Sequence, residues 1–196
     1  RSTRDFNATV KHHFSRQPAL GSLVVADRSG TLIAGSAPYK ATPELVADRD
    51  YFNRHRDNAA TGLVISPPLR SRLNGEWIIT LSRRYESRPG EFAGAVIASV
   101  RVDHLRQLFA SIDLGPNGAI SLRELDLAMV TRHPKLATPE ASVGSRSVSV
   151  QLKEAIRSAP VAGTYLASTR MDRIERTNTY RRMARYPYYI IVGLAD

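Results

Sequence analysis

The residues best suited to bind a small ligand lie in one stretch, Asp48-Arg-Asp-Tyr-Phe52. An arginine fork donates paired hydrogen bonds to a carboxylate, and aromatic side chains beside it supply an apolar wall. Arg49 and Tyr51 therefore indicate a carboxylate pocket. A second interpretation stays open, in which Tyr51 and Phe52 anchor the core and Arg49 pairs with Asp48 or Asp50.

Residue types that carry catalysis are present but are not arranged for it. The five histidines include no i,i+4 pair with a carboxylate, which a zinc hydrolase helix would need. No serine has a glycine two positions away on both sides, so no nucleophile elbow is present. The chain has no cysteine, which excludes thiol catalysis, cysteine-ligated metals and disulfides. The sequence predicts no catalytic residue, no metal site and no cofactor.

The charge of the chain has to be explained as well. The formal net charge is +10, and arginines far outnumber lysines among the 28 basic residues. Such an excess can indicate nucleic-acid binding, contact with an anionic membrane, or an arginine-rich proteome. The charge is spread along the chain, with no zinc-ligand spacing and no glycine-rich phosphate loop. A solvated arginine-rich surface is favoured over a nucleic-acid partner.

The elements that must position these residues occur twice in the same order. The first set is a hairpin over 21–34, a helix over 44–56, a short strand over 62–66, long strands over 76–84 and 92–100, and a helix over 103–111. The second set is a hairpin over 118–131, a helix over 150–158, and strands over 164–169, 177–185 and 188–194. The hairpins are marked by β-branched runs around turn residues such as Gly30. The repeated order predicts two α+β units.

A polar segment precedes these units. Its apolar residues Phe6, Val10 and Phe14 are spaced as in an amphipathic helix. No stretch reaches the roughly 18 apolar residues that cross a bilayer. The start at Arg1, inside this helix-compatible stretch, is typical of an excised fragment, so membrane anchors are expected on both sides.

Further motifs surround the Asp48–Phe52 stretch, namely Gly62-Leu-Val-Ile-Ser-Pro-Pro68, Arg70-Ser-Arg-Leu-Asn-Gly-Glu-Trp77, Phe92-Ala-Gly-Ala-Val-Ile-Ala-Ser-Val100 and Leu114-Gly-Pro-Asn-Gly118. With these motifs the chain resembles the double Cache family, the tandem PAS-like extracellular sensors of bacterial histidine kinases, chemoreceptors and diguanylate cyclases. The resemblance is specific over residues 48–134. Over the last sixty residues only the strand order supports it.

The resemblance implies an α+β fold with a long N-terminal helix over residues 1–20. A membrane-distal PAS-like ligand-binding module over 21–112 and a smaller membrane-proximal one over 113–196 would follow, each a central antiparallel sheet flanked by helices. It also implies the periplasmic part of an inner-membrane receptor that dimerises through the N-terminal helix. The output domain would be a diguanylate cyclase or a histidine kinase, and the fragment itself would not be an enzyme.

The resemblance also implies a ligand site. In amino-acid-binding relatives an Arg-x-Trp pair grips the ligand carboxylate, and an aspartate on the last strand takes the amino group. Arg49 and Tyr51 occupy the Arg-x-aromatic positions, whereas Ser99 stands near the aspartate position and Pro68 near a tyrosine position. The partner for an ammonium group is missing, so a carboxylate or another small polar anion is expected in place of an amino acid.

Strand alternation adds further candidates. One face of the 76–84 strand carries Trp77, Ile79, Leu81 and Arg83 and is typical of a core that faces a helix. The other, more polar face carries Ile78, Thr80, Ser82 and Arg84, and alternation does not tell which face lines the pocket. Arg70 and Arg72 follow the two prolines and are placed to form a lid. The candidate site residues are Arg49, Tyr51, Arg70, Arg72, Trp77, Ser82 and Ser99.

Arginines also cluster near the end of the chain, at Arg170, Arg173, Arg176, Arg181, Arg182 and Arg185. The family layout places this segment near the bilayer, where attraction to anionic headgroups is worth up to about 1 kcal/mol per residue. Alternatively, they are strand-edge arginines that discourage aggregation.

Four functions can be ranked. A sensor domain for a small carboxylate or polar anion is favoured, followed by a protein-interaction or structural domain without a small ligand. A nucleic-acid binder is third, on charge alone. A hydrolase is last, because no nucleophile, base and orienting group can be assembled.

Overall fold

The chain is described by a computed structural model that covers residues 12, 14, 19–36, 45–169 and 171–195. It forms two compact units, Arg1–Arg101 and Val102–Asp196. The helix predicted over residues 1–20 lies almost wholly outside the described residues. Within the described part of the chain, no helix is long and apolar enough to cross a membrane.

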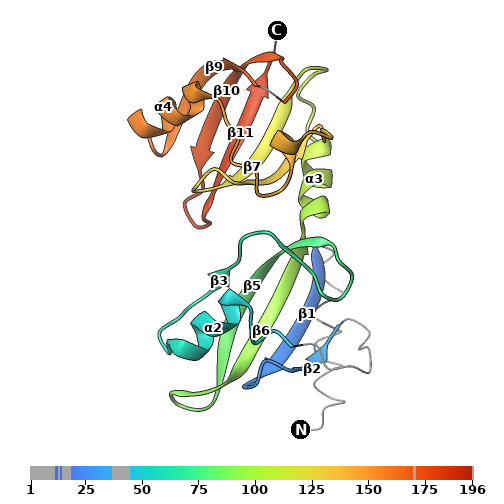
Figure 1. The fold of residues 1–196 in the computed structure, drawn as a ribbon, viewed down its shortest axis with the longest axis vertical. Helices are drawn as coiled ribbons and strands as arrows, with labels where there is room; N and C mark the ends of the chain where they lie inside the picture. Colours follow the sequence, from blue (N-terminus) through green and yellow to red (C-terminus); the bar gives the residue numbers. More distant parts are fainter. Residues whose placement is uncertain (1–11, 13, 15–18, 37–44, 170, 196) are drawn as a thin grey trace. The chain divides into compact units, whose positions relative to one another are not determined.

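The first unit is an antiparallel sheet with the helix α2 (Asp50–Asp57) on one of its faces (Figure 1). The strand order is β2-β1-β6-β5-β3, and β4 also pairs with β5. Its strands are β1 (Leu20–Asp27), β2 (Leu32–Gly35), β3 (Val64–Ile65), β4 (Leu69–Arg70), β5 (Trp77–Arg88) and β6 (Glu91–Arg101). The predicted hairpin and both long strands are confirmed.

The predicted helix over 44–56 is wrong at its start, because α2 begins only at Asp50. Before it, Leu45 bridges Thr31 and the Val46 amide donates to the Gly30 carbonyl at 2.8 Å, and residues 47–49 form a turn. Gly30 has φ +82°, and a Cβ there would lie 2.6 Å from the Ala47 nitrogen. Pairing with the sheet thus outweighs helix formation in this segment.

The second unit is an antiparallel five-stranded sheet with the order β8-β7-β11-β10-β9. Its strands are β7 (Ala119–Glu124), β8 (Met129–His133), β9 (Ala162–Ser168), β10 (Glu175–Arg182) and β11 (Tyr188–Leu194). Its helices are α3 (Val102–Ala110), the 3-10 turn η1 (Pro139–Ala141) and α4 (Val150–Ser158). The compact unit begins with α3 at Val102. The module boundary expected after residue 112 stays a prediction.

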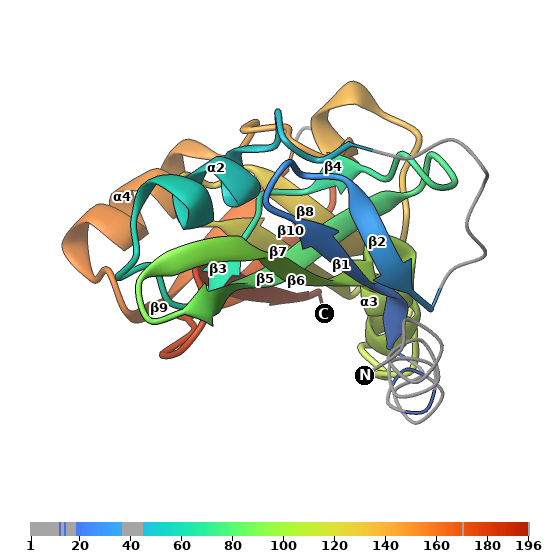
Figure 2. The same cartoon turned by 90° about the horizontal axis from the view of Figure 1, so that it is seen from below.

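The second unit confirms the predicted helix over 150–158 and the predicted strand over 188–194 at both of their bounds. The Ser149 side chain caps α4 by accepting a hydrogen bond from the Leu152 amide at 3.2 Å. Leu152 then packs on Tyr180, Tyr189 and Ile191 of the sheet. The capped helix closes this core with Leu152, and its residues Ala155 and Ile156 also pack against it. Figure 2 shows α4 from below.

The arginines near the chain end do not form one surface. Arg176 is buried, which corrects its placement in a lipid-facing cluster. Arg173, Arg181, Arg182 and Arg185 are exposed, and Arg170 lies outside the described residues. Because β10 is paired on both sides, by β9 and β11, the edge-strand interpretation is wrong for the arginines on this strand.

We expect Leu152→Ala to lower the free energy of unfolding by about 2–5 kcal/mol, because Leu152 is 2% exposed and removal of its side chain leaves a cavity. Leu166→Ala is the matched control, since Leu166 on β9 is 57% exposed and its loss should cost less than about 0.5 kcal/mol. Urea unfolding followed by circular dichroism measures both. Equal losses in the two variants would contradict α4 as a packed element.

Candidate ligand-binding site

Two contacts fix the position of α2 along β5. At the start of the helix, Arg49 Nη2 donates to the Arg70 carbonyl of β4 at 3.0 Å. Further along, His55 Nε2 lies 2.9 Å from Ser82 Oγ of β5, and both residues are buried. Since β4 pairs with the first residues of β5, α2 runs along β5 from its beginning. Tyr51 stands between the two anchor points, one turn before His55 on the same side of the helix.

The face of β5 under the helix is the polar one. Ser82 bonds His55 of α2, and Arg84 Nη1 donates to the His55 carbonyl at 3.0 Å. The expectation that the Trp77, Ile79, Leu81 and Arg83 face meets the helix was therefore wrong. The burial of this polar face is supported by α2, which supplies partners to the Ser82 hydroxyl and to Arg84 Nη1.

A row of hydroxyl groups crosses this same face. Ser99 of β6 is the register partner of both Ser22 on β1 and Thr80 on β5. The Ser22 and Ser99 hydroxyls lie 2.7 Å apart. Thr80 Oγ1 is buried and has no hydrogen-bond partner among the described residues, although the Thr80 amide donates to Ser66 Oγ at 2.9 Å. The hydroxyl row of Ser22, Ser99 and Thr80 thus retains capacity to bind a polar group.

Arginines gather where α2 begins. Arg72 forms a bidentate pair with Asp48, with N–O distances of 2.9 and 2.6 Å. Arg49 forms no ion pair with any residue that the structure describes, so its predicted pairing with Asp48 or Asp50 is absent from this part of the chain. The Arg72–Asp48 pair is exposed, and solvent screens such pairs strongly. Arg49 is therefore the arginine of this group that can bind an anion.

Tyr51 belongs to the core and also lies near this charge. It is buried in the cluster that includes Phe52, whose ring meets that of Phe92 edge-on with centroids 5.5 Å apart. Burial raises the pKa of Tyr51 to about 12; Arg49 and Arg72 act against the shift, and the Asp48 charge adds to it. The phenol therefore keeps its proton at neutral pH and serves as a hydrogen-bond donor beside Arg49.

Two of the predicted site residues lie on the opposite side of β5 from Ser82. Trp77 and Arg70 are direct cross-strand partners, and the Arg70 guanidinium sits over the indole ring, 4.4 Å from its centroid. Arg70 also donates to the Gly75 carbonyl at 2.8 Å. By strand alternation the Trp77 side chain points away from the face that carries Ser82. The structure brings Arg49, Tyr51 and Arg72 together but does not bring Trp77 to the hydroxyl row.

Two residues of the site were missed by sequence reasoning. His55 had been interpreted as an ordinary surface or core histidine, although its i,i+4 spacing from Tyr51 puts both on one helix face. Thr80 was grouped with Ser82 but was not selected. No group of three or more histidine, aspartate or glutamate side chains that could hold a metal occurs within the described ranges. Arg49 can donate hydrogen bonds to a small anion at the start of α2, and the hydroxyl row can orient a polar group under the same helix.

Comparison with known families gives a match over the second unit. Residues 102–193 match a family of histidine kinase sensor domains, dCache_1_like. The match to this sensor family covers the part of the chain where the sequence resemblance had been weakest. A search of curated protein sequences finds no match.

Solved structures of sensor domains resemble the whole chain. The extracellular domain of a proposed histidine kinase, rpHK1S-Z16, is 28% identical with a TM-score of 0.84, covering 100% of this chain and 79% of that one. The ligand-binding domain of the Campylobacter jejuni chemoreceptor Tlp3 in complex with L-valine is 14% identical with a TM-score of 0.64, covering 98% of this chain and 73% of that one. The ligand-binding domain of Mlp24 with asparagine is 14% identical with a TM-score of 0.67, covering 98% and 75%. The last two show likeness of fold alone.

The buried His55 should make stability depend on pH. Burial lowers its pKa, the hydrogen bond with Ser82 opposes this, and the charges of Arg54 and Arg84 add to it. Below the unfolded value of about 6.5 the unfolded chain binds a proton that the native chain resists, so stability falls as the pH drops. We expect His55→Gln to flatten the loss of unfolding free energy between about pH 7.5 and 5.

Denaturant unfolding at several pH values measures this slope. Ser82→Ala is the matched control, because it keeps the buried imidazole and removes the hydrogen bond that opposes the lowered pKa, so the loss of stability on acidification should be kept or become steeper. An unchanged slope in His55→Gln would show that His55 does not titrate in this way.

Proposed function

We propose that this chain is the periplasmic double Cache sensor of an inner-membrane receptor, with residues 21–112 as the ligand-binding module and 113–196 as the membrane-proximal one. Two antiparallel α+β units and the match to histidine kinase sensor domains support this. The likeness to the extracellular domain of rpHK1S-Z16 extends over the whole chain. The output domain would be a histidine kinase or a diguanylate cyclase, and the chain itself would catalyse nothing.

The ligand of the first unit is a small carboxylate or polar anion. The observation that carries this is Arg49, which has no acidic partner among the described residues and stands beside the neutral phenol of Tyr51. The buried, unpartnered Thr80 hydroxyl offers a polar contact under the same helix. Structurally similar domains have been solved with valine and with asparagine. Here Ser99 stands in the hydroxyl row where an acid would be needed to pair with an ammonium group.

Binding would act on α2. Arg49 belongs to the turn that opens this helix, and His55 ties the same helix to β5. A ligand that contacts Arg49 and the hydroxyl row would therefore favour one position of α2 on the sheet. It shifts the receptor between two states only by the difference in its affinity for them. Dimerisation through residues 1–20 would carry that shift to the output domain.

A protein-interaction domain without a small ligand is the alternative. It shares the fold and differs in one observable property, since it would show no stabilisation by any small molecule.

We expect small carboxylates to raise the melting temperature of the chain, because a ligand at about 100 times its Kd adds roughly 2.7 kcal/mol to native stability. Arg49→Ala should abolish the part of the shift that comes from the first unit, while Arg88→Ala, an exposed arginine at the end of β5, should retain it. A thermal-shift screen of carboxylates, amino acids, amines and sugars checks this. If Arg49→Ala kept the full ligand-induced rise in melting temperature, Arg49 would not be part of the site.

The membrane-proximal module (residues 113–196) should associate with anionic membranes through its exposed arginines. Arg181→Glu combined with Arg185→Glu should reduce co-sedimentation with vesicles that contain phosphatidylserine, because each charge near the surface is worth about 1 kcal/mol. Arg88→Glu in the first unit is the matched charge-reversal control. Co-sedimentation that does not depend on anionic lipid content would contradict the contact.

A further inference from the structure

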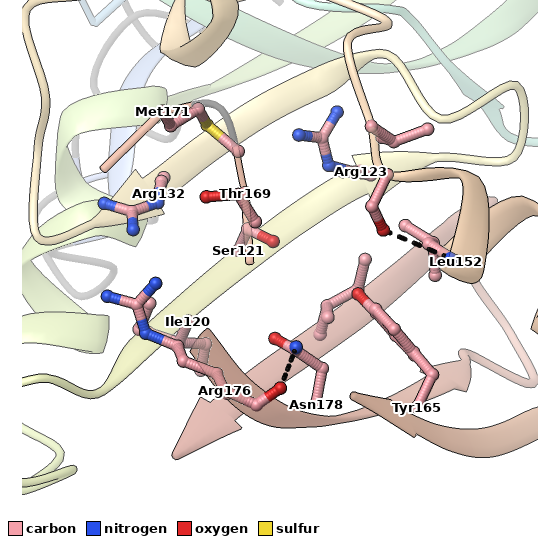
Figure 3. Close-up of a pocket in the computed structure, with 15 residues that line it drawn as sticks. Ile120, Ser121, Arg123, Arg132, Leu152, Tyr165, Thr169, Met171, Arg176 and Asn178 are labelled. Atoms are coloured by element: carbon pink, nitrogen blue, oxygen red, sulfur yellow. Dashed lines mark hydrogen bonds between the residues drawn. The ribbon is translucent and has the colours of Figure 1, made fainter. Parts of the chain in front are cut away.

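The second unit contains a cavity of about 40 Å³ between α4 and its sheet (Figure 3). Strands β7 and β8 and strands β10 and β11 supply its floor, and Leu152 of α4 and Tyr165 of β9 also line it. Its polar lining consists chiefly of three arginines with a serine, an asparagine and a tyrosine, namely Arg123, Arg132, Arg176, Ser121, Asn178 and Tyr165. A cavity under a short amphipathic helix is ordinarily apolar, so three guanidinium groups in this one require an explanation.

Two of the arginines share one acid. Arg132 Nη2 donates to Asp172 Oδ2 at 2.6 Å, and Arg176 forms a bidentate pair with the same carboxylate at 2.8 and 3.0 Å. Arg176 Nε also donates to the Asn117 carbonyl at 2.6 Å. Burial raises the pKa of Asp172, but the hydrogen bonds from Arg176 and the Ile174 amide and the two arginine charges outweigh it and hold the value at about 2. Asp172 is therefore ionised and balances one of the two charges.

The third arginine has no acidic partner. Arg123 is 2% exposed, and its guanidinium donates only to carbonyls, those of Leu127 at 2.7 Å and of Ser145 and Ser147 at 3.2 Å. Burial lowers the pKa of Arg123 to about 10, with Tyr165 acting against the shift and Arg132 adding to it, so the group stays charged at neutral pH. Within the described residues, three buried guanidiniums thus face one carboxylate. A buried charge without a counter-charge is costly, which favours an anion in this cavity.

Neutral groups around the cavity suit an anion too. Burial raises the pKa of Tyr165 to about 12, opposed by Arg123 and assisted by Tyr180, so the phenol is a proton donor. Ser121 is the direct cross-strand partner of Arg132. Gly193 leaves room in the floor, because a Cβ there would lie 2.4 Å from Asn178 Oδ1. Figure 3 shows Arg132 and Arg176 on one side of the cavity and Arg123 and Tyr165 on the other.

We propose that this cavity binds the carboxylate group of a small organic acid between Arg123 and the Arg132–Arg176 pair. One water occupies about 10–15 Å³ by the same measure, so 40 Å³ accommodates about three atoms, the size of a carboxylate group. Each guanidinium carries five N–H donors, which leaves donors beyond the bonds already described. The paired donors of arginine match the two oxygens of a carboxylate.

The remainder of such an acid has a place beside the cavity. A second, larger cavity of about 480 Å³ shares Val148, Ser149, Thr169 and Met171 with the first. Its lining includes Gln151 and Lys153 of α4. This site lies in the second unit, so it is separate from the Arg49 site and can exist whether or not the first unit binds a ligand.

Acetate is the simplest probe, with acetamide at equal ionic strength as the uncharged control. We expect acetate, and not acetamide, to raise the melting temperature of the wild-type chain and of Arg49→Ala. Ser121→Val should weaken acetate binding at least tenfold, because the larger side chain fills the cavity without removing charge. Thr177→Val, on the exposed face of β10, is the matched control and should respond like the wild-type chain.

Each result decides the proposal. A full acetate response in Ser121→Val, or no acetate response in the wild-type chain, overturns it. Loss of the response in Arg49→Ala with retention in Ser121→Val would also overturn it, since acetate would then bind only in the first unit, as the proposed function has it.

Ser121→Asp provides a second test that does not rely on the larger valine. Its carboxylate would stand beside Arg132 in the cavity and replace the acetate. We expect a melting temperature above that of the wild-type chain in acetate-free buffer and no further rise with acetate. A melting temperature below that of the wild-type chain, or an acetate response of wild-type size, would show that the cavity does not accept a carboxylate.

Discussion

Each of the two sheets is closed on one face by a short helix, and every polar group on that face must find a partner under the helix. Helix α2 has eight residues and α4 has nine, so neither can cover a sheet by apolar contact alone. In the first unit the polar groups are hydroxyls, one imidazole and the Arg84 guanidinium, and the His55–Ser82 bond ties the helix to the strand beneath it. In the second unit they are guanidiniums, and carbonyls and one carboxylate satisfy them.

This constraint explains why ligand sites form in such a fold. A hydroxyl or a guanidinium buried under a helix that does not fill the interface retains unused hydrogen-bonding capacity. Thr80 shows this with a neutral group and Arg123 with a charged one. An unpartnered neutral hydroxyl such as that of Thr80 costs little free energy, and a water molecule would suffice as its hydrogen-bond partner. The charged case favours an anion, because Arg123 keeps its charge at neutral pH and a buried charge without a counter-charge is costly.

The fold was predictable from the sequence where strands alternate or run apolar and where turn residues mark their ends. The strand over 188–194 and the helix over 150–158 match at both bounds. The start of α2 was not predictable from the sequence, because it depends on the pairing of Leu45 with Thr31. Local helix propensity does not include such a long-range contact. The prediction of which β5 face meets the helix was wrong for the same reason. Ser82 is placed under the helix by its hydrogen bond with His55, 27 residues away in sequence. Strand alternation alone cannot choose between the two faces.

The arginines show most clearly what sequence cannot supply. Arg176 and Arg181 lie five residues apart on β10 and look alike in a charge count, yet one is buried against Asp172 and the other is exposed. Period-2 alternation gives them opposite faces but does not tell which face is covered. No pattern in the sequence marked Arg123 and Arg132 as residues of a binding site, since each is the single arginine of its strand. Only the register of β7 with β8, together with the cover provided by α4, brings these charges together. The net charge of +10, for which a solvated arginine-rich surface was expected, therefore includes charges directed into the protein.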